Sequence, residues 1–179
     1  KIIDNLCRSL FAPTLLILLI LSWLWLSGSA LVWTLIFLLT PAVPLAAALS
    51  IEWRQDGAAR LVLMRAFRWL LALVFLPFEC VVMLSAISST LYRLAVSRKH
   101  LLQWTTAAHA LRIFGRDRMM LMFWQQMIFA PLLAAVLVIS LALARAPALA
   151  VASPLLAVWL ISPQIAHLIS RPYRKKKEF

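Results

Sequence analysis

Long uncharged apolar runs constrain the fold of this chain more than any other feature of its sequence. A transmembrane helix needs about 20 mainly apolar residues to cross about 30 Å of hydrocarbon. Four uncharged runs approach or meet this requirement: Leu10–Leu26, Ala30–Ile51, Met127–Ala144 and Leu149–Ser170. Only Ser27-Gly28-Ser29 separates the first two runs, and only Arg145-Ala146-Pro147-Ala148 separates the last two. Each pair is therefore expected to form a tight transmembrane helical hairpin.

The composition agrees with an integral membrane protein. Hydrophobic residues make up 64% of the 179 residues, and charged residues make up only 13%. Soluble domains are about 45–50% apolar and about 25% charged, so a water-soluble domain is excluded. The two cysteines, Cys7 and Cys80, cannot make a disulfide scaffold or a four-ligand metal site. The predicted class is an all-α polytopic membrane protein.

The distribution of basic residues predicts the orientation of the chain. The 18 lysines and arginines outnumber the 6 acids and give a net charge of +12. With four spans, every basic residue except Arg145 falls on one side of the membrane. Basic loops favour the cytoplasmic side, so both ends of the chain are expected there. A fifth span across Leu70–Leu84 would divide the basic residues between the two sides, which argues against it.

The middle of the chain, residues 52–126, has the pattern of amphipathic helices that lie in the membrane interface. At about 100° per residue, its polar residues fall on one side of a helix and leave a wide apolar face. Pro77 is expected to divide this layer into two helices. The residues on the polar side are Arg60, Arg65, Arg68, Glu79, Ser89, Arg93, Ser97 and Arg98.

Four segments follow from this pattern. The first transmembrane hairpin occupies residues 1–51, and the cytoplasmic or interfacial helices occupy residues 52–126. The second transmembrane hairpin occupies residues 127–170, and a basic cytoplasmic exit segment occupies residues 171–179.

Few side chains are candidates for chemistry. Glu79 is the one acid deep in an apolar run, and a buried proton-transfer role is weighed against a position on the polar side facing Arg68 or a lipid headgroup. The second interpretation is favoured. His100, His109 and His167 have no cysteine or carboxylate at ligand spacing, so no metal site is predicted. We expect no catalytic and no cofactor-binding residue in this segment.

The basic residues of the middle segment allow two interpretations. The simpler one is orientation plus attraction to anionic lipid, worth about 1 kcal/mol per basic residue near the surface. The other is docking of an acidic cytoplasmic domain or a nucleotide-sugar phosphate. Nucleic acid is not an expected partner, because topology accounts for the charge and no binding motif is present. The candidate interfacial or docking residues are Arg65, Arg68, Glu79, Arg93, Arg98 and Lys99.

Three strings, in order along the chain, resemble the membrane region of cyclic β-1,2-glucan synthases. Lys1–Pro13 resembles the segment that follows the glycosyltransferase domain of that family. Leu76–Glu79 together with Thr90–Ala108 is similar to the family's central membrane signature. Ile161–Ala166, followed by Ile169–Pro172, resembles the exit from the last span. Cys7 and Gln103 stand where the family more often has Arg and Glu.

The resemblance implies a large, multi-pass enzyme of the inner membrane of Gram-negative bacteria. Such enzymes use UDP-glucose, with a divalent metal, to build a β-1,2-glucan that is closed to a ring and becomes a periplasmic osmoregulated glucan. The resemblance implies glycosyltransferase and glycoamylase-like and phosphorylase-like domains on the same polypeptide. The family's nucleotide-sugar motifs belong upstream of Lys1, so no catalytic residue is carried over. The priming attachment residue is not assigned to Tyr92 or Tyr173.

Two alternatives come from other classes. The first is a stand-alone small cationic inner-membrane protein, acting as an assembly factor or transporter subunit. It predicts an initiator Met just before Lys1 and a stop codon after Phe179, whereas the enzyme-module interpretation predicts a longer reading frame. The second, less favoured, is an intramembrane hydrolase that uses Glu79 and His109.

Overall fold

The computed structural model describes residues 2–43, 46, 58–97 and 119–170, and every regular element in these ranges is a helix. The all-α class is therefore confirmed for the part of the chain that the structure describes. The helices are α1 (Ile2–Leu24), α2 (Ala30–Leu39), α4 (Ala58–Val74), α5 (Leu76–Tyr92), α7 (Met119–Met127), α8 (Phe129–Ala144) and α9 (Ala146–Ile169). A short 3₁₀ turn, η1 (Thr40–Ala42), extends α2, and a π-helical turn, η2 (Arg93–Ser97), extends α5.

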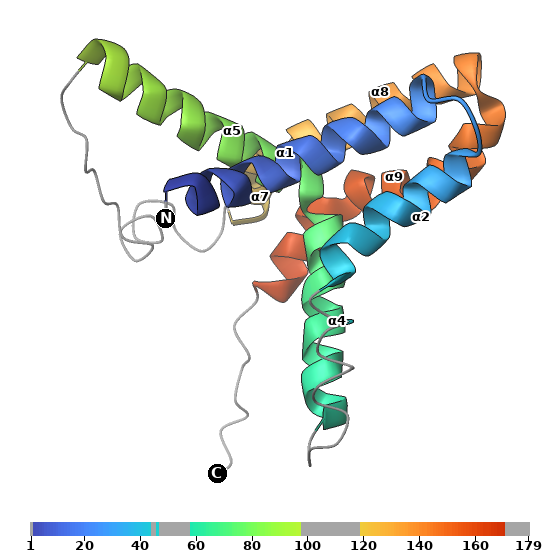
Figure 1. Ribbon diagram of the computed structural model, residues 1–179, viewed down its shortest axis with the longest axis horizontal. Helices are drawn as coiled ribbons and strands as arrows, with labels where there is room; N and C mark the ends of the chain where they lie inside the picture. The colour runs from blue at the N-terminus through green and yellow to red at the C-terminus, as the bar shows by residue number, and fades with distance from the viewer. Residues whose placement is uncertain (1, 44–45, 47–57, 98–118, 171–179) are drawn as a thin grey trace.

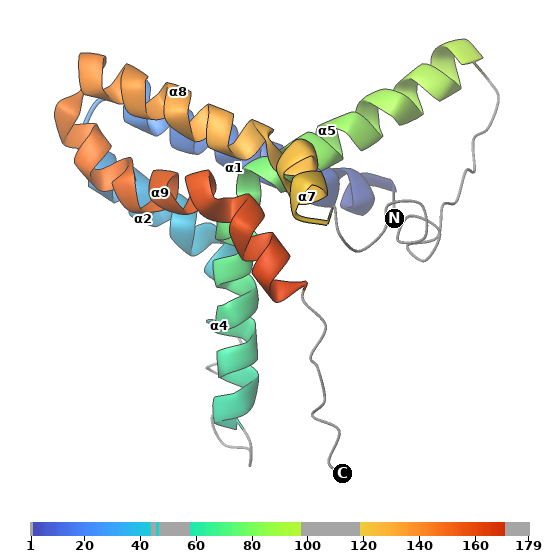
Figure 2. The ribbon, with the colours of Figure 1, turned by 180° about the vertical axis from the view of Figure 1, so that it is seen from behind.

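The helices pair as two hairpins that lie side by side. α1 lies beside α8, α2 lies beside α9, and the turns of both hairpins are at the same end of the bundle (Figure 1). The view from behind shows the same neighbours (Figure 2). We call this end of the bundle the turn end. α4 and α5 leave the bundle in different directions, and α5 runs away from the turn end.

The turn between α1 and α2 depends on Gly28, which has a φ of +100°. Residues other than glycine rarely adopt this backbone conformation, because their Cβ atom clashes with the backbone. The indole of Trp33 donates a hydrogen bond of 3.2 Å to the carbonyl of Ser27 and helps to close the turn. The short linker around Gly28 thus reverses the chain as its sequence predicts.

Two tryptophans occupy the centre of the bundle. The rings of Trp23 on α1 and Trp159 on α9 are both fully buried, with centroids 6.0 Å apart. Trp23 Nε1 donates to Thr34 Oγ1 over 2.8 Å, and that hydroxyl donates in turn to the carbonyl of Ala30 over 2.7 Å. Polar atoms inside the bundle are thereby paired. Small buried residues allow α8 and α9 to approach closely: Ala130, Ala134, Ala148 and Ala152.

A helix break separates α4 from α5 at Phe75. Pro77 has no backbone N–H, so the carbonyl of Leu73 loses the donor that a continuous helix would provide four residues later. Trp159 Nε1 donates to this carbonyl over 2.9 Å. The expected division at Pro77 is therefore present. Trp159, from the second hairpin, supplies the hydrogen-bond donor that the proline lacks.

Within the residues that the structure describes, three helices are long and apolar enough to cross a membrane: Asn5–Leu24, Leu76–Val96 and Ala146–Ile169. A fourth span results if α7 and α8, which meet at 53°, are taken together as one broken span. The apolar helix Ala30–Ala42 is shorter. Most of the rest of the expected second span, up to Ile51, lies outside the described residues. A membrane location therefore agrees with the helices, whereas the four-span layout remains a prediction.

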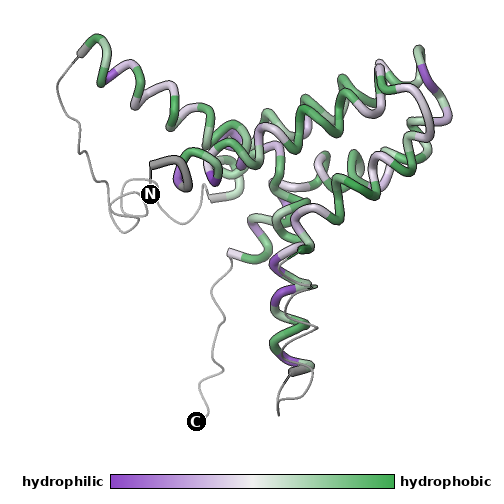
Figure 3. Tube along the Cα trace, in the orientation of Figure 1, coloured by the Kyte–Doolittle hydropathy of each residue, from purple (hydrophilic) through white to green (hydrophobic). Residues whose placement is uncertain are grey.

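The interfacial layer expected across residues 52–126 is not uniform. α4 carries hydrophilic positions along its length, whereas the hairpin helices are largely hydrophobic (Figure 3). Leu76–Val96 has the length and hydropathy of a span, because the break at Phe75 separates it from the arginines of α4. Within this range only Glu79 and Arg93 are charged. The polar residues predicted to share one side of a helix, from Arg60 to Ser97 among those described, are therefore divided between α4 and α5 with its extension η2, and do not form one continuous surface.

Candidate functional site

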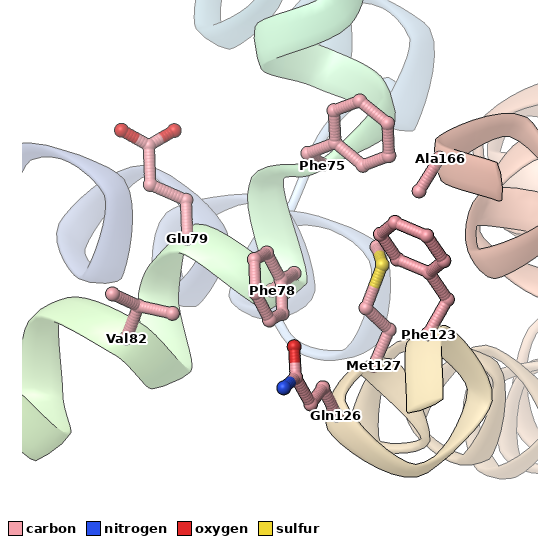
Figure 4. A pocket seen from close by; sticks show the side chains of 8 residues that line it. All are labelled: Phe75, Phe78, Glu79, Val82, Phe123, Gln126, Met127 and Ala166. Atoms are coloured by element: carbon pink, nitrogen blue, oxygen red, sulfur yellow. The ribbon is translucent and has the colours of Figure 1, made fainter. Parts of the chain in front are cut away.

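The most distinctive cavity lies between α5, α7 and α9 and has a volume of about 340 Å³. Its walls are apolar except at two positions, a carboxylate and an amide. Figure 4 shows the lining residues: Phe75, Phe78, Glu79, Val82, Phe123, Gln126, Met127 and Ala166. We call this cavity the α5–α7–α9 cavity.

Two helix breaks shape this cavity. The break at Phe75 turns the chain so that Phe75 and Phe78 both line it. The bend of 53° between α7 and α8 brings Phe123 and Met127 to the opposite wall. Pro131, which lies just after that bend, lacks an N–H and weakens the helix at this point. Two prolines in the sequence therefore produce the bends between which the cavity lies.

Glu79 lies in the first turn of α5, where a negative charge is favourable beside the positive end of the helix dipole. Its side chain is half-buried. In the close view the carboxylate points away from Phe123 and Met127, at the edge of the cavity (Figure 4). Within the described ranges the structure gives its carboxylate no hydrogen bond or ion pair. The contact with Arg68 that we considered is thus not seen there.

The structure separates the other candidate docking residues. Arg65 and Arg68 lie on α4, whereas Arg93 lies at the far end of α5, where η2 begins. Since α4 and α5 diverge, these arginines lie on two arms and not on one face (Figure 2). The remaining candidates, Arg98 and Lys99, lie outside the described residues.

Residues able to hold a metal are scarce in the described helices. No group of three or more His, Cys, Asp or Glu side chains comes together there. His167 lies edge-on to the ring of Phe123, with centroids 6.1 Å apart. Cys7 is exposed and Cys80 is buried, and both are free thiols. His100 and His109, including the partner considered for Glu79 in hydrolysis, lie outside the described ranges.

Sequence reasoning missed the role of Arg145. This half-buried arginine directs Nη1 toward carbonyls at the C-terminal end of α1 and in the turn that follows, at 3.5 Å from Trp23 O and 3.0 Å from Leu26 O. A cation at a helix C-terminus is favourable because it meets the negative end of the dipole. Arg145 therefore fastens the turn of the second hairpin to the turn of the first. The sequence offered one signal for this role, because Arg145 is the only charged residue between the apolar runs Met127–Ala144 and Leu149–Ser170.

A second cavity, of about 400 Å³, lies between the two turns and is lined by residues that include Gly28, Arg145 and Val151. It lies at the opposite end of the bundle from the α5–α7–α9 cavity. The arginine that lines it already bonds to the carbonyls of Trp23 and Leu26.

Comparisons with known proteins assign no family to the chain: no family model matches it, and no curated protein is significantly similar. The candidate site is therefore described from its geometry alone. Among the described residues this geometry supports an apolar bundle with one cavity suited to an amphiphilic molecule.

Proposed function

We propose that this chain is the membrane-anchoring module of a cyclic β-1,2-glucan synthase. The observation that carries the proposal is the order of the three resembling strings, at the start, middle and end of the chain. The module holds a cytoplasmic transferase and the glycoamylase-like and phosphorylase-like domains at the inner membrane. It performs no catalytic step itself, and UDP-glucose and its divalent metal bind in the transferase.

The arrangement of the helices supports an anchoring role. Both hairpin turns lie at one end of the bundle, so each hairpin returns the chain to the opposite end. Arg145 is the only lysine or arginine between the helices at the turn end. Since basic residues favour the cytoplasmic side, the turn end faces the periplasm in this proposal. Domains attached at either end of the chain then share the cytoplasmic side.

The basic arms supply a surface for such domains and for lipid. In this proposal Arg65 and Arg68 on α4 and Arg93 on η2 meet anionic headgroups or acidic patches of the transferase. Charge reversal of Arg68 and Arg93 in the complete enzyme is expected to weaken docking of the transferase. Undiminished glucan synthesis and docking in these variants would remove the surface role.

The decisive experiment reads the coding sequence on both sides of the chain and assays membranes that contain its product. We expect a reading frame that continues through both ends, with an Asp-rich nucleotide-sugar domain upstream. Membranes given radiolabelled UDP-glucose and a divalent metal should form protein-linked glucan and a ring without a reducing end. An initiator Met directly before Lys1, a stop codon after Phe179 and no incorporation would instead favour a stand-alone membrane protein.

A further inference from the structure

The α5–α7–α9 cavity has a chemistry that anchoring alone does not require. Its volume of about 340 Å³ lies at the lower end of the range of about 300–1,000 Å³ for small-molecule pockets. Three phenylalanines, Phe75, Phe78 and Phe123, provide most of its aromatic surface (Figure 4). Such walls accept a hydrocarbon chain because the aromatic rings and the chain pack closely through van der Waals contacts.

The cavity lies near the end of α9 that is opposite the turn end. α9 has 24 residues, and at about 1.5 Å per residue it is longer than the hydrocarbon core of about 30 Å. Ala166, which lines the cavity, is in the last turn of α9, at the end opposite Arg145. A phospholipid whose tail enters the cavity would therefore keep its headgroup in the polar region.

The polar groups at the edge of the cavity select the headgroup. The carboxylate of Glu79 is half-buried, and it bonds to no other side chain that the structure describes. Gln126 adds an amide beside Phe78 (Figure 4). A carboxylate accepts hydrogen bonds, so the complementary group is a cation with N–H donors. An anionic headgroup would be repelled by Glu79.

We propose that the α5–α7–α9 cavity binds a phospholipid with a primary ammonium headgroup, of the phosphatidylethanolamine class. One acyl chain lies against Phe75, Phe78 and Phe123, and the ammonium group donates to Glu79. A choline headgroup carries the same charge but has no N–H donor, so it binds more weakly. The proposal requires a membrane setting and is independent of glucan synthesis.

Native mass spectrometry of the purified chain in detergent micelles tests the headgroup preference. Phosphatidylethanolamine, phosphatidylcholine and phosphatidylglycerol with identical acyl chains are titrated separately. We expect the ethanolamine lipid to bind about tenfold more tightly than the choline lipid, because its charge-assisted hydrogen bonds to Glu79 are strong. Glu79→Gln should abolish this preference. The control, Gln125→Ala, changes an exposed polar side chain of α7 that does not line the cavity, and should retain it.

The apolar wall is tested separately. Phe123→Ala should weaken the binding of all three lipids, whereas Phe11→Ala, which removes an exposed ring from α1, should not. A preference that survives Glu79→Gln would overturn the headgroup assignment, and so would tighter binding of phosphatidylglycerol to the unmodified chain. Equal effects of the two phenylalanine variants would overturn the assignment of the acyl chain.

A measurement on the unmodified chain avoids any dependence on how the variants fold. An ethanolamine phospholipid with a photoreactive diazirine in its acyl chain is cross-linked in vesicles, and the labelled peptides are identified. Labelling should concentrate on peptides that contain Phe75–Val82 or Phe123–Met127. Labelling spread evenly over the lipid-facing helices, including the exposed residues of α2, would contradict the proposal.

Discussion

The indole N–H of Trp159 donates a 2.9 Å hydrogen bond to the backbone carbonyl of Leu73. The two residues are 86 positions apart in the sequence. Pro77 leaves this carbonyl without its helical donor. The indole of Trp159, from the second hairpin, supplies the missing hydrogen bond at the break between α4 and α5. This bond joins the α4–α5 break to the centre of the bundle, because Trp159 also contacts Trp23.

Replacing Trp159 with Phe should destabilise the chain by about 1–3 kcal/mol, since a buried carbonyl loses its partner and the smaller ring leaves space. The measurement is unfolding by increasing SDS in mixed micelles, followed by far-UV circular dichroism. Trp25→Phe is the matched control, because Trp25 is 73% exposed. Its effect should stay within about 0.5 kcal/mol. Equal losses in the two variants would contradict the role of the hydrogen bond.

The same bond can be isolated from the change in ring size. Pro77→Ala restores an N–H four residues after Leu73, and this N–H can satisfy the same carbonyl. Trp159→Phe should therefore cost less in the Pro77→Ala background than in the unmodified chain. A cycle of the two single variants and the double variant measures this difference. Strict additivity of the two changes would show that they act independently.

Arg145→Met should cost about 1–2 kcal/mol, because it removes the cation from the carbonyls of Leu26 and Trp23 while keeping an aliphatic stem. The same SDS titration measures the loss. Arg68→Met is the control, since Arg68 is exposed on α4. Its stability should change by less than about 0.5 kcal/mol. If both variants unfold alike, the contact between the two turns contributes nothing measurable.

The hairpins could be predicted because their information is local. Uncharged runs mark the helices, and the linker around Gly28 marks the reversal. The division at Pro77 was also local, since a missing N–H is a property of one residue. The bend between α7 and α8 follows the same rule at Pro131, but the span predicted from the sequence began at Met127 and included no bend.

The candidate site was less accessible to sequence reasoning. Glu79 was singled out as the one acid deep in an apolar run, but Phe123 and Gln126 join it only through the packing of α7 against the rest of the bundle. The bond from Trp159 to Leu73 has no sequence signal besides the free carbonyl that Pro77 implies. Periodicity failed at Phe75, because a helix wheel assumes one axis and the chain changes direction there.

Gly28→Ala should destabilise the first hairpin by about 1 kcal/mol, since the φ of +100° strains any side chain. The space itself is not limiting, because an added Cβ would lie 3.7 Å from Trp33 Nε1, an ordinary contact. Gly28→Asn should cost less than Gly28→Ala, because asparagine tolerates positive φ better. SDS titration of the two variants gives this order. If Gly28→Asn is the less stable variant, the loss of stability comes from side-chain packing and not from the backbone conformation.

The position of α5 in the membrane can be decided with single cysteines. Cys7→Ser and Cys80→Ala remove the native thiols, and exposed Ser29, Ala146, Ala95 and Ser170 are replaced by Cys one at a time. We expect a membrane-impermeant maleimide to label Ser29→Cys and Ala146→Cys from the periplasm, because both lie at the turn end. Ser170→Cys should be labelled only in inverted vesicles.

Ala95→Cys is the discriminating probe. α5 begins beside Trp159, about halfway along α9, and runs away from the turn end (Figure 1). Arg93 at its far end favours the cytoplasmic side, and so do Arg98 and Lys99, which follow in the sequence. We therefore expect Ala95→Cys to be labelled together with Ser170→Cys, only in inverted vesicles. Labelling of Ala95→Cys from the periplasm would mean that α5 crosses the bilayer, and the two ends of the chain would then face opposite sides.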